Sequence, residues 1–296
     1  MQKKVNYSNT MEIKAESKCH FCDICDGHGC ISELPGMGGA YSNENFISNC
    51  ADWTKYDGSG TELPFIRLAP ITGAMQNVGY LEEKPFYFDI ISESISAGIR
   101  LSIGDGYPDE KLKFGIEALH EAKTKGAVFI KPYENTRIME RMEWASGVSE
   151  IIGVDIDSYA ILTMRNLVNL QQKTARDLLE LKKHTHTQFA VKGIFRPEDI
   201  ELVKEVRPDI IVVSNHGGRV ETLHGSSVDF LAAYGKTLRN YAGEIWVDGG
   251  IRKRHDLLAA KKLGASEVMI GRPFITALLR YGHGGIKTRV QEMLKH

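Results

Sequence analysis

The sequence predicts an α/β fold: a closed (β/α)8 barrel (TIM barrel) with a short Cys-rich N-terminal extension. Two observations lead to this prediction. From about Phe65 onward, eight short apolar runs alternate with helix-like segments, and such alternation is typical of parallel sheets. Polar residues directly follow several of these runs, as expected where barrel strands end at the functional face.

The eight expected strands are rich in Val and Ile and nearly continuous in apolarity, which suits parallel strands covered on the outside by helices. They lie at residues 64–70, 97–103, 126–132, 150–156, 188–194, 209–215, 244–250 and 267–273. Helices are expected between them, for example at 108–126, 196–206 and 254–264. The first of these has a proline and acidic residues at its start and a glycine at its end. An open, doubly wound sheet is the alternative architecture.

The chain has 296 residues, of which 42% are hydrophobic and 25% charged, ordinary values for a globular protein. A barrel of about 250 residues places the barrel at residues 61–296 and leaves residues 1–60 as an extension and lid. The formal net charge is −1, so we expect neither a nucleic-acid nor a membrane partner. Without a membrane-length apolar stretch or a secretion-signal pattern, a cytoplasmic location is expected.

The motif SNHGGR at residues 214–219 places reactive side chains at the predicted barrel mouth. His216 suits a general base because the pKa of imidazole lies near neutrality. Arg219 suits a bidentate clamp on a carboxylate. Lys192 ends another apolar run, where a lysine is costly unless it meets an anion. It is therefore interpreted as a fixed cation, as a Schiff-base nucleophile, or as a surface side chain whose stem is buried.

Glycine-rich loops follow the last two expected strands. One contains Asp248, Gly249, Gly250 and Arg252, and the other contains Gly271 and Arg272. The corresponding loops of (β/α)8 barrels often bind phosphate. Glycines let backbone N–H groups approach phosphate oxygens, and a helix N-terminus favours the negative charge. The alternative is that the glycines are turn residues and the arginines are solvated.

Taken together, SNHGGR, the Lys192-Gly193 pair, VDGGIR and IGRPF resemble the FMN-dependent α-hydroxy acid oxidases and dehydrogenases, the family of glycolate oxidase and lactate oxidase. The resemblance runs from roughly Leu63 to Tyr281. It implies a barrel with FMN at its mouth that oxidises a 2-hydroxy acid or a related CH–OH compound. It also implies a homo-oligomer, a tetramer in this family.

The same resemblance assigns roles to individual residues. His216 matches the base that takes a proton from the substrate, and Asp155 matches the carboxylate that orients it. Arg219 matches the residue that binds the substrate carboxylate, and Lys192 lies beside the flavin N1–O2 edge. The flavin and its phosphate tail would be contacted by Pro70, Ile71, Thr72, Ser102, Lys192, Ser214, Asp248, Gly249, Gly250, Arg252, Gly271 and Arg272.

The substrate pocket departs from the family pattern. Lys131 stands where the family has a substrate-binding tyrosine, and Phe129 stands where it has a flavin-contacting glutamine. Gly104 and Asp105 replace an expected aromatic residue. Lys131 would favour a more anionic small-molecule substrate, unless Asp105 neutralises it. The pattern leaves the electron acceptor, oxygen or another protein, open.

Four of the five cysteines, Cys19, Cys22, Cys25 and Cys30, lie within twelve residues. The clustering favours a metal or redox site over a disulfide scaffold. Their spacing is compatible with a tetrahedral zinc site, with an iron–sulfur cluster, or with reduced or redox-switching thiols. An iron–sulfur cluster near the flavin would pass electrons to a protein acceptor, whereas zinc would stabilise the structure of a short lid.

Two other functions are compatible with the residues. One is a barrel lyase or isomerase that uses Lys192 as a Schiff base with a sugar phosphate. The other is a non-catalytic flavin- or metal-binding redox sensor built around the cysteines. The combination of Lys192, His216 and Arg219 favours the oxidoreductase, because a sensor needs no proton acceptor.

Overall fold

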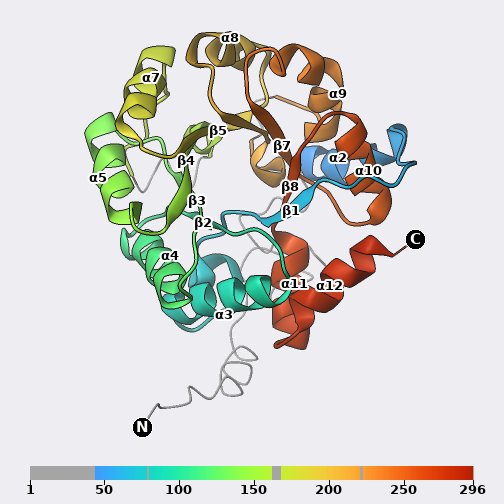
Figure 1. Cartoon of the computed structure of the whole chain (residues 1–296), viewed down its shortest axis with the longest axis horizontal. Coiled ribbons are helices and arrows are strands. Elements are labelled where there is room, and N and C mark those ends of the chain that lie inside the picture. Colours follow the sequence, from blue (N-terminus) through green and yellow to red (C-terminus); the bar gives the residue numbers. More distant parts are fainter. Residues whose placement is uncertain (1–43, 79, 162–167, 221–222, 296) are drawn as a thin grey trace.

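Eight parallel strands surrounded by helices form the (β/α)8 barrel that the sequence predicts (Figure 1). The computed structural model describes residues 44–78, 80–161, 168–220 and 223–295. The strands are β1 (Phe65–Leu68), β2 (Ser102–Gly104), β3 (Gly126–Ile130), β4 (Ser149–Asp155), β5 (Gln188–Ile194), β6 (Ile210–Val213), β7 (Glu244–Asp248) and β8 (Glu267–Ile270). Each of the eight overlaps one of the expected apolar runs.

The helices surround the strands, most of them in a ring outside the barrel (Figure 1). They are α2 (Glu44–Ala51), α3 (Glu83–Ser96), α4 (Glu110–Glu121), α5 (Asn135–Ala145), α7 (Ala175–His184), α8 (Pro197–Val206), α9 (Ser227–Leu238), α10 (Arg254–Lys262), α11 (Arg272–Tyr281) and α12 (Gly285–Leu294). Short turns lie at η2 (Asp52–Lys55), η3 (Ala74–Val78), η4 (Ile156–Ala160) and η5 (His216–Gly218). In the described part of the chain, no helix is both long and apolar enough to cross a bilayer.

The sheet closes between β1 and β2. The ladder runs in the order β1-β8-β7-β6-β5-β4-β3-β2, and a single parallel bridge joins Arg67 to Arg100 at the seam. Two backbone hydrogen bonds support it, from Leu68 N to Arg100 O (2.8 Å) and from Arg100 N to Ile66 O (3.0 Å). The open doubly wound sheet is therefore wrong.

Local sequence signals begin several helices where they were expected. The carboxylate of Asp199 accepts hydrogen bonds from the backbone N–H groups of Phe195 and Arg196, at the start of α8. The carboxylate of Asp256 does the same for Arg252 and Lys253, just before α10. Each satisfies backbone donors that a helix leaves unpaired at its N-terminus.

The core has two parts. A small cluster inside the barrel contains side chains such as Phe129, Trp246 and Met269, and a larger one lies between the strands and the surrounding helices. The barrel interior is filled with side chains, as in other barrels of this size. Two clusters of buried charged side chains lie at its two ends, around Arg67 and around Lys192.

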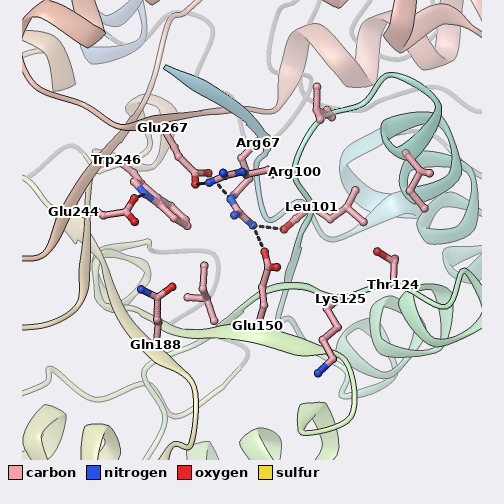
Figure 2. A pocket seen from close by; sticks show the side chains of 13 residues that line it. Arg67, Arg100, Leu101, Thr124, Lys125, Glu150, Gln188, Glu244, Trp246 and Glu267 are labelled. Carbon is pink, nitrogen blue, oxygen red and sulfur yellow. Dashed lines mark hydrogen bonds and ion pairs between the residues drawn. The ribbon is translucent and has the colours of Figure 1, made fainter. Parts of the chain in front are cut away.

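The N-terminal end of the barrel carries a buried ion-pair cluster (Figure 2). Arg67 is 1% exposed and lies between Glu267 (Nε–Oε2, 2.7 Å) and Glu150 (Nη1–Oε1, 3.1 Å). Its guanidinium lies 4.6 Å from the ring centre of Trp246, and Arg100 forms a second ion pair with Glu267. These residues line a cavity of about 500 Å³, and all of them come from the starts of strands or from the segments just before.

The segment before β1 packs on the opposite end, beside the loops after β6 and β7. Asn49 of α2 exchanges hydrogen bonds with Asn215 (2.7 and 3.2 Å). The indole N–H of Trp53 donates to Gly249 O (2.9 Å). The turn η2, which carries Trp53, contacts both α9 and α10. Residues 44–55, assigned from sequence to an extension, thus pack directly on the barrel loops.

Candidate active site

Lys192 is the centre of a buried polar cluster at the C-terminal ends of the strands. Its side chain is 3% exposed, and its Nζ lies 3.0 Å from Asp155 Oδ1 and 3.1 Å from Ser214 Oγ. Asp157 and Asp248 each place an oxygen 3.7 Å away. The interpretation of Lys192 as a surface side chain is therefore wrong, and the fixed-cation interpretation fits the geometry.

The charges around Lys192 determine its protonation state. Burial by itself lowers the pKa of a lysine, but the carboxylates of Asp155, Asp157 and Asp248 outweigh burial and raise the pKa of Lys192 above its usual value. The ammonium form is thus fixed across the physiological range. A Schiff-base lysine must instead lose its proton to attack a carbonyl, so the cluster disfavours the lyase interpretation.

A β-bulge shapes β5 at this point. The pairing with β6 shifts register between Lys192 and Ile194, and Gly193 has φ of 101°. A side chain at this position would come within 2.5 Å of the Asp157 Cβ. Gly193 therefore allows both the left-handed backbone conformation and the close approach of Asp157.

Asp155, the last residue of β4, binds two lysines. Its Oδ2 lies 2.9 Å from Lys131 Nζ, and its Oδ1 accepts from Lys192. Burial raises the pKa of a carboxyl group, but the two ammonium groups outweigh burial and hold the pKa of Asp155 well below its usual range. Asp155 is therefore a permanent anion between two cations.

This arrangement also settles which residue neutralises Lys131. Asp105 was one possible partner, but its carboxylate accepts from the backbone N–H of Lys131 (3.2 Å) and from Arg141 Nε (3.1 Å). The ammonium of Lys131 binds Asp155 instead. The alternative in which Asp105 neutralises the Lys131 side chain is therefore not the one observed, because the ammonium of Lys131 reaches the carboxylate at the end of β4.

His216 follows β6 in a strained backbone conformation. Its φ is 56°, in the left-handed region, and Gly217 and Gly218 continue there with φ of 65° and 95°. Asn215 Oδ1 accepts from Gly218 N (3.0 Å), and Ser214 Oγ accepts from His216 N (3.0 Å). A non-glycine residue held in this region costs about 1–3 kcal/mol and is found most often at functional sites.

The imidazole of His216 contacts carboxylates from β4 and η4. Its Nδ1 lies 3.1 Å from Asp157 Oδ1 and 3.7 Å from Asp155 Oδ1. Burial lowers the pKa of His216 well below its usual value, so the ring is neutral at pH 7. Burial and the adjacent charge of Asp155 raise the pKa of Asp157, whereas the ammonium groups of Lys192 and Lys131 act in the opposite direction and favour its carboxylate form. Asp157 was not among the residues predicted to act, although the sequence places it two residues after Asp155.

The same side chains do not suit a metal ion. Asp155, Asp157 and His216 have potential ligand atoms within 4.8 Å of one another. However, Asp155 is already bonded to the ammonium groups of Lys131 and Lys192, and their positive charge repels a cation.

The glycine-rich loops after β7 and β8 lie beside α2 and the His216 turn. A side chain at Gly250 would lie 1.6 Å from the backbone oxygen of Asn49, so this glycine is required by the packing of α2. Arg272, the first residue of α11, donates from Nη1 and Nη2 to Gly217 O (3.1 Å each). It also lies 4.8 Å from the ring centre of Phe46 of α2.

The remaining predicted flavin contacts include two unsatisfied polar atoms. Ser102 Oγ and Asp248 Oδ1 are buried and have no hydrogen-bond partner among the described residues. Pro70, Ile71 and Thr72 follow β1 and are partly exposed at the rim. Buried polar atoms usually have partners, so Ser102 and Asp248 mark positions where the polar edge of a ligand fits. The cysteines predicted to bind metal lie outside the described residues.

Comparison with known proteins identifies the family. The sequence profile of the FMN-dependent dehydrogenase family matches residues 120–296, which is more than half of the chain. The chain belongs to the FMN-dependent dehydrogenase family. The family resemblance noted from SNHGGR, VDGGIR and IGRPF is thereby confirmed.

Individual relatives match a shorter part of the sequence. The chain is 38% identical over 122 residues to L-lactate dehydrogenase (cytochrome) of Saccharomyces cerevisiae, covering 40% of this chain and 21% of the relative. It is 42% identical over 113 residues to the 2-hydroxyacid oxidase of Dictyostelium discoideum, covering 38% of this chain and 29% of the relative. The match thus spans less than a third of either relative.

Solved structures of the family share the fold over most of the chain. Mandelate oxidase with 3,3-difluoro-2-hydroxy-3-phenylpropionic acid has a TM-score of 0.67 at 20% identity, covering 97% of this chain and 91% of that chain. The flavin-binding domain of baker's yeast flavocytochrome b2 has a TM-score of 0.68 at 20% identity, covering 86% and 75%. At this identity, the comparison shows the barrel fold alone.

Proposed function

We propose that this protein is an FMN-dependent oxidoreductase that oxidises a 2-hydroxy acid or a related CH–OH compound. The observation that carries the proposal is the cluster around Lys192, in which a buried ammonium and a carboxylate-bound imidazole lie at the functional end of a barrel of this family. The family relatives named above include a 2-hydroxyacid oxidase and an L-lactate dehydrogenase.

The residues present fit FMN. Ser102 and Asp248 offer buried polar atoms that lack partners among the described residues, and Lys192 offers a fixed positive charge. Gly271 and Arg272 start α11, where backbone N–H groups favour a phosphate. Pro70, Ile71, Thr72, Ser214, Gly249, Gly250 and Arg252 complete the proposed binding set. When bound, FMN supplies the two-electron acceptor.

The chain's own residues would handle the substrate proton and charge. Arg219 would bind the substrate carboxylate and orient the carbon that is oxidised. His216 is neutral at pH 7 and is held through Nδ1, so its other nitrogen, Nε2, would take the proton. Lys192 would stabilise negative charge that develops beside it; preorganised charges of this kind are worth about 3–4 kcal/mol each.

The proposal is tested by cofactor analysis and a substrate panel. The purified protein should be yellow, and mass spectrometry of the released cofactor should identify FMN. A series of 2-hydroxy acids, assayed with oxygen and separately with an artificial electron acceptor, should give turnover and distinguish an oxidase from a dehydrogenase. A colourless protein that fails to bind added FMN would contradict the proposal.

We further propose a metal at Cys19, Cys22, Cys25 and Cys30, as either zinc or an iron–sulfur cluster. Metal analysis of the purified protein distinguishes the two. Replacing Cys22 by Ser should lower the metal content while leaving the FMN content near that of the unaltered protein. Metal-free protein as purified under reducing, chelator-free conditions would contradict this assignment.

A further inference from the structure

We propose that Asp157, rather than Asp155, is the positioning residue of His216, binding Nδ1 so that Nε2 faces the substrate. The inference rests on the proposed function for the identity of the proton that His216 takes. It does not need that function for the contact between Asp157 and the imidazole, which can be observed in the protein itself.

The distances separate the two carboxylates. Asp157 Oδ1 lies at hydrogen-bond distance from Nδ1, at 3.1 Å. Asp155 Oδ1 lies at 3.7 Å, beyond the range of a hydrogen bond between nitrogen and oxygen. Only Asp157 can therefore fix which ring nitrogen carries the hydrogen.

Asp155 is also bonded elsewhere. One of its oxygens accepts from Lys131 at 2.9 Å, and the other accepts from Lys192 at 3.0 Å. Turning either oxygen toward His216 would break an ion pair that is almost fully buried, which is strongly unfavourable. The cation from β3 thus holds Asp155 away from His216, and the second carboxylate of the Asp-Ile-Asp segment takes its place.

The neighbouring strand is shaped to admit Asp157. Gly193 lies next to Lys192 in the bulge of β5, and a Cβ there would come within 2.7 Å of the Asp157 Cβ, Cγ and backbone nitrogen. The absence of a side chain at Gly193 is what brings the η4 turn close enough for its carboxylate to reach the imidazole.

The backbone of His216 is fixed independently of its ring. Ser214 and Asn215 hold the left-handed turn by accepting hydrogen bonds from the backbone N–H groups of His216 and Gly218, whereas the imidazole itself is bound by Asp157. Asp157 is therefore the contact that sets the ring's tautomer. Lys131, Lys192, Arg219, Asp155 and Asp248 also surround this pair with charge.

The test compares Asp157→Asn with Asp155→Asn in the FMN-loaded protein labelled with ¹⁵N-histidine. In the unaltered protein, the ring signals of His216, assigned by their loss in His216→Asn, should report hydrogen on Nδ1. In Asp157→Asn, the amide oxygen should turn toward Lys192, because the ammonium of Lys192 is a hydrogen-bond donor. The amide N–H₂ group then faces Nδ1 of His216 and needs Nδ1 to be an acceptor. Hydrogen should therefore move to Nε2, while Asp155→Asn keeps the original tautomer.

Kinetics give a second readout of the same contact. Asp157→Asn should lower kcat on the order of 100-fold, the scale of general-base catalysis, with KM for the 2-hydroxy acid changed less than about threefold. Asp157→Ala, which has no acceptor, should show the same tautomer change and serves if the Asn variant misfolds. If both Asp157 variants misfold, Asp155→Asn decides the matter: an unchanged tautomer supports Asp157, and a changed tautomer overturns the proposal. Absence of hydrogen on Nδ1 in the unaltered protein also overturns it.

The outcomes distinguish the two proposals. Original ring signals in both Asp157 variants, or a tautomer change in Asp155→Asn alone, would assign the contact to Asp155 and overturn the inference. The expected tautomer change in a protein that oxidises no 2-hydroxy acid would overturn the proposed function and leave Asp157 as the positioning residue.

Discussion

The two ends of the barrel both bury charged side chains but use them differently. At the N-terminal end, Arg67 lies between Glu150 and Glu267, and its guanidinium also donates to Leu101 O (2.6 Å) (Figure 2). At the C-terminal end, Lys192 has three carboxylates within 3.7 Å, and the pKa values of these carboxyl groups are moved in opposite directions.

The difference indicates that the buried charges at one end stabilise the fold, whereas those at the other end can support chemistry. A buried cation with matched partners holds the strands together and has little freedom to exchange protons. Around Lys192, three carboxylates outnumber the ammonium groups. The carboxyl group of Asp157 and the imidazole of His216 can therefore take part in proton transfer. In barrels, the C-terminal end is the functional one, and the four predictions below test whether the two ends are separate in this protein.

Replacing His216 should have the largest effect, and at pH 7 this effect should fall on catalysis. Asparagine tolerates the left-handed backbone of this position, so His216→Asn should fold and retain FMN. Turnover should fall about 10²- to 10⁴-fold because the base is lost. The matched control is His283→Asn, since His283 is 91% exposed and bonds Glu93 away from the cluster. Equal turnover in the two variants would remove His216 from the chemistry.

Replacing Arg67 should affect stability and leave catalysis intact. Arg67→Met removes the partner of two glutamates and leaves the buried Glu267 with only Arg100, so the free energy of unfolding should fall by about 3 kcal/mol. Urea denaturation measures this loss. Turnover per folded molecule should match that of the unaltered protein; a selective loss of turnover would mean that the two ends are coupled.

Replacing Asn49 should produce an intermediate effect at the catalytic end. Asn49→Ala removes the hydrogen bonds to Asn215 and to the backbone N–H of Ser227 (2.9 Å). Buried groups left unpaired cost about 1–3 kcal/mol, so both stability and turnover should fall. Ile47→Ser is the control on the same helix, because Ile47 is 56% exposed. It should change neither quantity.

The smallest expected effect is a pH dependence of stability from His216. Its pKa is lowered in the folded protein, so below about pH 6.5 the unfolded chain takes up a proton that the folded protein refuses. Stability should therefore fall with decreasing pH, by about 1.4 kcal/mol between pH 7.5 and 5.5 from this residue. Urea denaturation of His216→Asn should show a smaller loss over this interval, and an equal loss would contradict the assigned direction.

Much of the fold could be predicted because its signals are local. Eight apolar runs of strand length, each followed by a helix-like segment, leave few ways to bury every strand. Most of the expected runs were longer than the strands, since residues such as Ser214 and Gly249 leave the ladder to form rim loops. The pattern of apolar residues indicates which segments are buried, but it does not show at which residue the backbone hydrogen bonds between neighbouring strands end.

The sequence predicts which residues form the candidate site, but it does not predict all the hydrogen bonds and ion pairs between them. Lys192, His216, Asp155 and Ser214 were all expected at one rim, and the structure brings them together. Asp105 was named as a possible partner of Lys131, whereas the ion pair between Lys131 and Asp155 and the contact of Asp157 with His216 were not foreseen. The Asp-Ile-Asp segment was the available signal, but residue type cannot decide between two aspartates two positions apart.

The sequence by itself determined the barrel, the family and the residue types at the rim, because strand periodicity and short motifs are properties of neighbouring residues. The tertiary structure decided which carboxylate reaches His216, which one holds Lys131, and what packs against Gly250. The first of these choices depends on a difference of less than 1 Å between the distances from His216 Nδ1 to the two carboxylates. Such distances are set by the bulge at Gly193 and by the packing of α2, and no local pattern encodes them.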